Sequence, residues 1–275
     1  MDVQKAILVA IILVLFAALG LELKVIEDSI RGASVATGDQ CEKLCSQKSE
    51  VPYVSDSSCF CKEPISFSRQ WKCFANATFE NDSMFSSKFN DTEIRDVAVE
   101  SVVKYPAPNA PATKIFGIFN RVSSTIKYVS DPSGNEYVAR PLETWESGGG
   151  DCDDFSVLLA SMYEAVGLDA SIVEVYNVTT AHAFVIVRIE QDMDSFLNSY
   201  KSMLEKYTPY FSEKPLNFVV FRNSASECES ADKSLEAGGN TDTFYLVIES
   251  TSGDYPGSRD AFEGYSGERF IKVGK

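Results

Sequence analysis

Apolar residues recur along the chain with two different spacings, and the spacing predicts which segments form helices and which form strands. Apolar residues three or four positions apart predict helices at residues 92–105, 113–128, 155–166 and 191–207. Runs rich in valine, isoleucine and aromatic residues predict strands at residues 170–176, 181–189, 216–221 and 243–249. The polar stretches at residues 141–150 and 224–241 are expected to be loops. Helices followed by strands in this order predict an α+β domain.

The first part of the chain contains an uninterrupted apolar segment. Residues 6–21 carry no charged or strongly polar side chain, and the apolar character continues to residue 26. This length lies between the about 7–15 residues of a secretory signal and the roughly 20 residues that span a membrane. A buried core helix fits less well, because the segment has no polar face. We expect residues 1–26 to form an uncleaved signal anchor, with a cleaved signal peptide as the alternative.

Five of the seven cysteines cluster just after the apolar segment: Cys41, Cys45, Cys59, Cys61 and Cys73. Their C-x3-C and C-x-C spacings, without a nearby histidine, favour disulfide bonds over a zinc site. Three bridges formed by these five and Cys228 would leave Cys152 as a free thiol, although the spacing does not determine the pairing. Disulfide bonds imply an oxidising compartment.

Four N-x-S/T triplets agree with such a compartment, because this triplet is the acceptor for glycosylation in secreted proteins. They lie at Asn76, Asn81, Asn90 and Asn177. We therefore expect a single-pass protein of the cell membrane whose C-terminal body is extracytoplasmic, or a secreted protein if the signal is cleaved. Its Cys-rich, loop-rich segment would span residues 27–90 and its larger domain residues 91–275.

The overall composition narrows the classes of partner. Hydrophobic residues make up 44% of the chain and aromatic residues 12%, which is enough for an ordinary core. The formal net charge of -15 repels phosphate backbones, so we expect no nucleic-acid partner. The expected partners are the membrane, through the N-terminal helix, and a protein or peptide substrate at the cell surface.

Cys152 is set apart from the other cysteines by its position at a predicted helix start. Three glycines precede it, and they allow a tight bend and the close approach of a substrate. A helix N-terminus favours the thiolate, which is the nucleophilic form of cysteine. The neighbouring Asp151, Asp153 and Asp154 oppose thiolate formation, and they are typical of helix caps or, alternatively, of calcium ligands.

A histidine and an acid later in the chain complete a constellation for nucleophilic catalysis. His182 is the only histidine of the chain and begins a predicted strand. A neighbouring imidazole activates a cysteine by taking its proton, and an acceptor behind the imidazole holds it in the required tautomer. Glu249, at the end of a predicted strand, is the candidate acceptor, because adjacent antiparallel strands can set it beside His182. Asp254 is the reserve candidate.

The segments around these residues resemble the transglutaminase-like superfamily. The sequence GDCDDFSVLL at residues 150–159, with ETW at residues 143–145, is similar to the family's nucleophile region. AHAFV at residues 181–185 resembles its histidine strand, and YLVIEST at residues 245–251 resembles the strand of its third residue. The resemblance covers about residues 92–257. It departs from the family in having glutamate where aspartate is usual, and in the roughly 60 residues that separate the last two segments.

This resemblance implies a papain-like α+β core, with the nucleophile at a helix N-terminus packed on an antiparallel sheet. It implies Cys152 as the nucleophile, His182 as the general base and acid, and Glu249 as the orienting acid. The backbone N–H of Cys152 would stabilise an oxyanion, and the indole of Trp145 would either assist it or only pack. No cofactor is required, although some bacterial cysteine peptidases of this superfamily depend on calcium.

The function predicted from the sequence is that of a membrane-anchored, extracytoplasmic cysteine enzyme acting on amide bonds through a thioester. Hydrolysis by a peptidase or amidase is preferred over protein crosslinking by a transglutaminase. Two further alternatives are a surface binding module on the same fold and a structural protein in which Cys152 is bridged to another cysteine.

Overall fold

The computed structural model describes residues 33–34, 38–55, 58–132, 136–208, 213–236 and 243–274. The chain divides into two compact units, and each is described by itself. The first consists of Met1–Pro64 with Glu205–Ser212, and the second of Ile65–Leu204 with Glu213–Lys275. The predicted signal anchor lies outside the described residues, and within the described parts no helix is long and apolar enough to span a membrane.

The first unit is a small module fastened by two disulfide bonds. It contains the helix α2 (Gly38–Ser46) and the strands β1 (Ala33–Ser34), β2 (Val51–Ser55) and β3 (Ser58–Lys62), with the strand order β1-β3-β2. The bonds Cys41–Cys59 and Cys45–Cys61 tie α2 to β3. Cys41 and Cys45 have no exposed surface, so the sulfur atoms form much of the interior of this module. The predicted disulfide framework is confirmed here.

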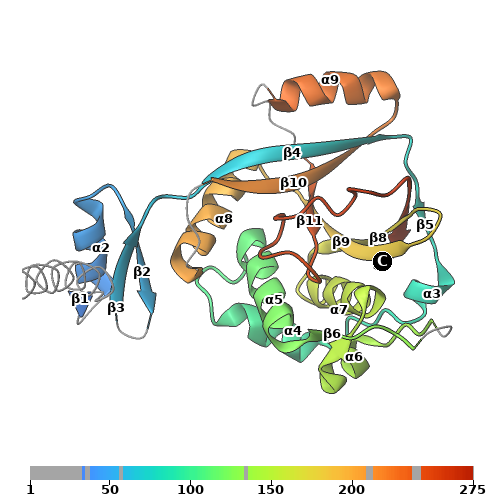
Figure 1. The fold of residues 1–275 in the computed structure, drawn as a ribbon, viewed down its shortest axis with the longest axis horizontal. Coiled ribbons are helices and arrows are strands. Elements are labelled where there is room, and N and C mark those ends of the chain that lie inside the picture. Colours follow the sequence, from blue (N-terminus) through green and yellow to red (C-terminus); the bar gives the residue numbers. More distant parts are fainter. Residues whose placement is uncertain are drawn as a thin grey trace, which may run out of the picture. The chain divides into compact units, whose positions relative to one another are not determined.

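The second unit is built on a seven-stranded mixed sheet with the order β4-β10-β11-β9-β8-β12-β5 (Figure 1). Its strands are β4 (Ser66–Ala75), β5 (Phe79–Glu80), β8 (Asp169–Tyr176), β9 (Ala181–Ile189), β10 (Glu213–Arg222), β11 (Phe244–Ile248) and β12 (Gly267–Lys272). β4 is parallel to β10 and β5 is parallel to β12, while the other neighbours are antiparallel. The expected antiparallel sheet is therefore present, with a parallel strand added at each edge.

Four helices gather on one face of this sheet (Figure 1). They are α4 (Arg95–Val103), α5 (Pro111–Thr125), α6 (Pro141–Ser147) and α7 (Cys152–Ala165). α7 contacts β8 and β9 and also α4, α5 and α6. Residues 155–163 of α7 are all buried, because the helix is covered on every side and is apolar around most of its circumference. This packing fixes the position of the first turn of α7.

The remaining elements complete the second unit. They are α3 (Ser83–Ser86), α8 (Met193–Tyr207) as far as Leu204, α9 (Ala225–Glu236) and a short parallel pair of strands, β6 (Lys127–Tyr128) and β7 (Gly149–Gly150). β6 pairs with the glycine segment just ahead of α7, through hydrogen bonds from Lys127 N–H to Gly148 O (3.0 Å) and from Val129 N–H to Gly150 O (2.8 Å). The pair holds the segment that leads into the nucleophile helix.

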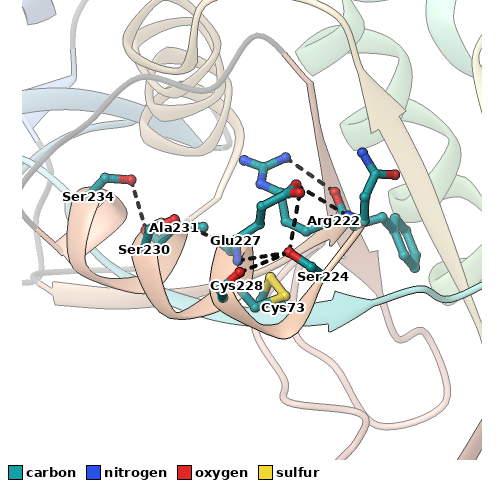
Figure 2. The surroundings of a disulfide bond; sticks show 11 residues. Cys73, Arg222, Ser224, Glu227, Cys228, Ser230, Ala231 and Ser234 are labelled. Carbon is teal, nitrogen blue, oxygen red and sulfur yellow. Dashed lines mark hydrogen bonds between the residues drawn. A yellow bond between two sulfur atoms is a disulfide. The ribbon is translucent and has the colours of Figure 1, made fainter.

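The prediction of a loop at residues 224–241 was wrong, since α9 occupies most of it. Ser224 caps the helix there: Glu227 N–H donates to Ser224 Oγ (3.3 Å), and the Glu227 carboxylate accepts from the N–H of the preceding residue Asn223 (3.3 Å). The Cys73–Cys228 disulfide joins the first turn of the helix to β4 (Figure 2). A polar sequence is helical here because capping and a covalent bond hold it.

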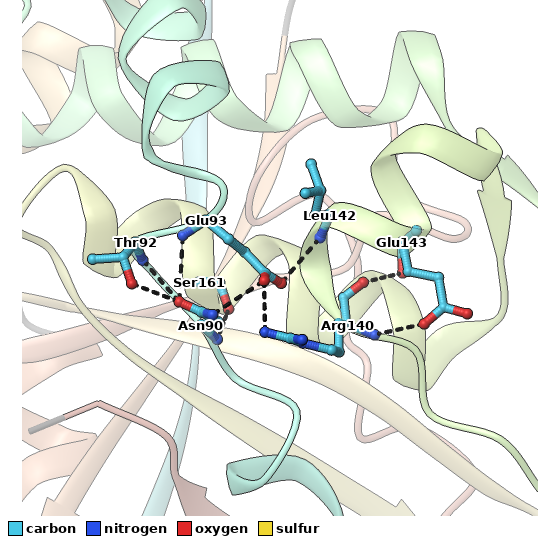
Figure 3. A network of polar contacts seen from close by, with 8 residues as sticks. Asn90, Thr92, Glu93, Arg140, Leu142, Glu143 and Ser161 are labelled. Carbon is cyan, nitrogen blue, oxygen red and sulfur yellow. Dashed lines mark hydrogen bonds and ion pairs between the residues drawn. The ribbon is translucent and has the colours of Figure 1, made fainter.

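The start of α4 also differs from the prediction, which placed it at residue 92. Asn90 Oδ1 accepts hydrogen bonds from the N–H groups of Thr92 (3.2 Å) and Glu93 (3.3 Å), and the regular helix begins only at Arg95 (Figure 3). The Glu93 carboxylate then pairs with the Arg140 guanidinium at 2.7 Å, at the start of α6. An asparagine-centred turn therefore replaces the expected first helical turn and connects α4 to α6.

Two further predictions about organisation were wrong. The boundary of the larger domain lies between Pro64 and Ile65 and not near residue 90, because β4 and β5 are strands of the main sheet. Residues 141–147, expected to be a loop, form α6. Its Pro141 stands at the first helical position, where a missing N–H costs nothing, and Gly148 ends the helix with a φ of 68°.

Candidate active site

Cys152 is the first residue of α7, and the aspartates around it form the helix cap. The Asp151 carboxylate accepts from Asp153 N–H (3.2 Å), while the buried Asp154 carboxylate accepts from Asp151 N–H (3.2 Å) and Ala139 N–H (2.7 Å). Two of the three aspartates therefore act as caps. Their bonds fix the turn on which the cysteine stands.

Gly150 is required by the same turn. A Cβ atom at this position would lie 2.6 Å from both Cβ and Oδ2 of Asp154, which is closer than atoms can approach. The glycine before the nucleophile thus makes room for the carboxylate that caps the helix. The prediction that the glycines permit a tight approach holds at Gly150, although the approaching group is Asp154 and not a substrate.

The Cys152 thiol is free, because the other six cysteines form the three disulfide bonds. This removes the alternative of a bridged Cys152. Its Sγ lies 3.6 Å from Asp153 Oδ1, and it accepts a hydrogen bond from Ala183 N–H on β9. Burial and the charge of Asp153 raise the pKa of the thiol to about 12, although the Ala183 N–H acts in the opposite direction. The resting thiol is therefore protonated.

Asp153 is the one aspartate of the three whose carboxylate faces the sulfur. Burial, with a further contribution from the charge of Asp151, raises its pKa to about 7. The thiol is a hydrogen-bond donor to this carboxylate, which lowers the pKa of Asp153 without cancelling the effect of burial. Near neutral pH, Asp153 therefore changes its charge directly beside the nucleophile.

His182 and Glu249 meet as the sequence predicts. β9 and β11 are adjacent and antiparallel, with Val185 opposite Ile248, so Glu249 follows the end of the ladder beside the histidine. His182 Nε2 forms a short hydrogen bond with Glu249 Oε2. The other carboxylate oxygen, Oε1, accepts from Thr251 N–H (2.7 Å) and Thr251 Oγ1–H (2.6 Å). The longer side chain of glutamate thus reaches the imidazole from the end of its strand.

The Glu249 carboxylate is held in its charged form although only 3% of the side chain is exposed. Burial alone would raise its pKa, but the hydrogen bonds and charge of His182 and the two bonds from Thr251 together lower it. A charged acceptor at Nε2 places a proton on that nitrogen. This leaves Nδ1, which has no hydrogen bond to any described residue, as the nitrogen that can take a proton from Cys152.

Two tyrosines flank the thiol and were not foreseen from the sequence. The Tyr265 ring stacks on the His182 imidazole, with 6.3 Å between the ring centres. Tyr128 stands on β6 opposite Gly150 and is 54% exposed. Burial is the main cause that raises the pKa of each phenol, and a negative charge on Cys152, when it is a thiolate, raises the pKa of both further.

The contacts that the structure gives for Trp145 and Asp254 are with other residues. The Trp145 ring packs under the Arg121 guanidinium, 5.1 Å from the ring centre, on the α5–α6 side. Asp254 is exposed, and its backbone N–H donates to Ser258 Oγ (3.0 Å). Within the described residues neither side chain is hydrogen-bonded to Cys152, His182 or Glu249. Glu249, and not the reserve candidate, is therefore the acid beside the imidazole.

Within the described residues, Asp151, Asp153 and Asp154 do not bring three carboxylate oxygens together as a cluster of metal ligands. The only cluster of three histidine, cysteine or acidic groups in the described part of the chain consists of Cys41, Cys45 and Cys59, whose sulfur atoms are in disulfide bonds. Calcium requires six to eight oxygen ligands. Asp151 and Asp154 accept backbone N–H groups as helix caps, and calcium binding at the three aspartates stays a prediction.

The four predicted glycosylation sites have two kinds of environment. Asn76 and Asn81 are exposed. Asn90 uses its side-chain amide to donate to Glu93 (3.1 Å), and Asn177 donates to Gly264 O (3.3 Å) while its oxygen caps the turn to β9. A glycan would attach at the amide nitrogen, so it would disturb the last two sites and not the first two.

Comparison with protein families agrees with this geometry. Residues 100–199 match the family model of the transglutaminase-like superfamily, and the resemblance seen in the sequence is thereby confirmed. The matched region contains Cys152 and His182 and ends ahead of Glu249. No curated protein matches the chain.

Several solved structures are similar to parts of the chain. One is a Cytophaga hutchinsonii protein provisionally described as a cysteine protease, with 15% identity over 36% of this chain and 34% of that chain, and a TM-score of 0.30. Another is calcium-bound LapG of Legionella pneumophila, with 24% identity over 38% of this chain and 62% of that chain, and a TM-score of 0.26. The chain thus spans about a third of the first protein and less than two thirds of the second.

Proposed function

We propose that this chain is a cysteine hydrolase that cleaves amide bonds, as a peptidase or amidase, through a thioester on Cys152. The observation that carries the proposal is the His182–Glu249 pair, whose histidine lies on β9, the strand whose Ala183 N–H contacts the Cys152 sulfur. A nucleophile, a base and an acid that orients the base are thus assembled on one helix terminus and two adjacent strands.

The reaction begins with the neutral thiol. The Cys152 proton moves to His182 Nδ1 as the sulfur forms a bond to the carbonyl carbon of the amide. The resulting imidazolium returns this proton to the amide nitrogen, the carbon–nitrogen bond breaks, and the amine leaves a thioester on the enzyme. Water then gives a proton to His182 and its oxygen to the acyl carbon. The carbon–sulfur bond breaks and His182 returns the proton to the sulfur, which releases the carboxylic acid and restores the thiol.

Two groups stabilise charge during these steps. The negative charge that develops on the carbonyl oxygen faces the start of α7, where the Cys152 backbone N–H has no partner within the helix. The imidazolium that forms at His182 is stabilised by the Glu249 carboxylate, whose own position is fixed by Thr251. Glu249 is therefore a positioning residue and Cys152 and His182 are catalytic residues.

The proposed location is the extracytoplasmic side of the cell membrane. The support for it is the apolar segment at residues 6–21, the three disulfide bonds and the two exposed sequons. Disulfide bonds persist in oxidising compartments. The proposed substrate is a protein or peptide at the cell surface, and calcium dependence stays a prediction that calorimetry with calcium chloride would check.

Crosslinking is the second candidate function, because an amine can resolve the same thioester in place of water. Incubation with dimethylcasein and a dansylated primary amine separates the two. Hydrolysis predicts casein fragments, or ammonia released from its glutamines, without dansyl incorporation. Incorporation that is lost in Cys152→Ala would instead establish transfer. Absence of both in the wild-type chain, tested also with a broad library of quenched peptides, would contradict the proposal.

A further inference from the structure

A cavity of about 320 Å³ lies beside the His182 imidazole, on the side of Glu249 and Thr251. Its other walls come from residues 252, 259–261, 263 and 265, and Tyr265 is stacked on the imidazole. Cys152 is not among its lining residues. The cavity is therefore adjacent to the base of the proposed reaction and separate from the nucleophile.

Because the cavity lies beside His182, its position determines which part of a substrate would enter it. The acid that protonates the leaving nitrogen must come within hydrogen-bond reach of it. The residue that follows the scissile bond therefore passes over the imidazole. A cavity next to the imidazole and away from the sulfur would receive that residue, on the leaving-group side of the substrate.

Two of the acidic groups that line the cavity have partners, whereas Arg259 and Glu263 form no ion pair with any described residue. Glu249 is bound by His182 and Thr251, and Asp260 forms an ion pair with Lys72 at 3.2 Å. Arg259 lines the cavity and forms no ion pair with any described residue. Its charge lowers the pKa of Tyr265, although burial and nearby negative charges raise it overall, and both residues line the cavity.

An arginine in this position is suited to binding a carboxylate. The guanidinium presents several N–H donors in a planar fork that matches the two oxygens of a carboxylate. Glu263 also lines the cavity and repels anions, so a neutral or basic residue is the competing occupant. Arg259 is exposed, and a substrate carboxylate would give it the partner that it does not have within the described chain.

We propose that the cavity between His182 and Arg259 is the subsite for the leaving-group side of the substrate, and that Arg259 binds a carboxylate there. The inference rests on the proposed amide cleavage for the direction of the substrate. The carboxylate is either an acidic side chain after the scissile bond or the free C-terminus of a short leaving peptide. Both sources present the same chemistry to Arg259.

The single histidine of the chain supplies a direct probe of the cavity, because its imidazole proton signals in an NMR spectrum need no separate assignment. The Cys152→Ala chain, which cannot turn over, is titrated with acetyl-Ala-Glu-amide, acetyl-Ala-Gln-amide and acetyl-Ala-Gln with a free C-terminus. We expect the acidic probes to shift the His182 signals with a Kd about tenfold below that of the neutral probe. The probe that gives the lower value identifies the source of the carboxylate.

The matched variants are Arg259→Gln and, as a control, Arg222→Gln at the end of β10, outside the cavity. The acid preference should disappear in the first and persist in the second. An equal response to all three probes, a preference for the neutral probe, or an acid preference that survives Arg259→Gln would overturn the inference. If the wild-type chain cleaves no amide but the Cys152→Ala chain still prefers the acidic probes, the proposed amide cleavage is contradicted while the carboxylate-binding role of Arg259 is supported.

Discussion

Asp153→Asn is the substitution that changes the nucleophile most directly without touching its partners. The Asp153 carboxylate lies 3.6 Å from the Cys152 sulfur, and burial together with this carboxylate raises the pKa of the thiol to about 12. Asparagine has nearly the same shape but no charge. The variant therefore removes a repulsion that only the thiolate experiences.

The size of the effect follows from the separation of the two charges. Two unit charges at this distance repel by about 4–5 kcal/mol at an effective dielectric constant of about 20. Solvent reaches both partly buried groups, and a shift of one pKa unit corresponds to about 1.4 kcal/mol. We therefore expect the pKa of Cys152 to fall by roughly 1–3 units in Asp153→Asn, which leaves it raised by burial.

The assay is the rate of reaction with Ellman's reagent between pH 6 and pH 10. Since Cys152 is the only cysteine outside the disulfide bonds, the colour reports this thiol alone. Asp153→Asn should react about 10- to 1000-fold faster than the wild type at pH 8, and Asp169→Asn, on β8, should match the wild type. An unchanged or slower rate in Asp153→Asn would refute the electrostatic reasoning.

The remaining predictions concern stability and the orienting acid. Because the pKa of Asp153 is raised from 3.8 to about 7, the native state binds its proton more tightly than the unfolded chain, and this contribution to stability falls as pH rises from about 4 to 7. Asp153→Asn should therefore be about 1–3 kcal/mol more stable than the wild type at pH 8, with a smaller difference at pH 4 in urea unfolding. Equal stability differences at both pH values would contradict this. In Gly150→Ala the free energy of unfolding should fall by about 1–3 kcal/mol in the same measurement, because the added methyl group collides with Asp154. A smaller decrease would mean that the Asp154 carboxylate can move away from its capping position. Glu249→Gln should reduce kcat about 10²–10⁴-fold with little change in KM, because a neutral partner allows the wrong tautomer of the His182 imidazole. Steady-state kinetics would check this, and a change in KM alone would argue against a role of Glu249 in orienting the imidazole.

The site could be predicted from the sequence where local signals were strong. Cys152 follows glycines at a helix start, and His182 is the only histidine, so both were found without knowledge of the fold. The pairing of β9 with β11 then brings Glu249 to the imidazole. Tyr265 and Arg259 could not be found, because they come from a loop that only the tertiary fold brings to His182.

The fold was less predictable where sequence patterns were weak. β4 is the partner of β10 in the sheet, yet its polar and apolar residues do not alternate regularly and most are half-buried, so no clear pattern marks the strand. The polar sequence of α9 predicts a loop because the helix is stabilised by the Ser224 cap and the Cys73–Cys228 bond, which no local pattern reveals. The charge of Asp153 beside the thiol likewise depends on which way the side chain turns, and sequence spacing does not reveal it.

The central claim is that Cys152 cleaves amides with His182 as its base. The most direct measurement is cleavage of a quenched-peptide library by the wild-type chain and by Cys152→Ala, His182→Ala and Arg222→Gln at pH 8. The account predicts cleavage by the wild type and by Arg222→Gln, and its loss by at least 100-fold in the other two. Cleavage that persists in Cys152→Ala or in His182→Ala would contradict it.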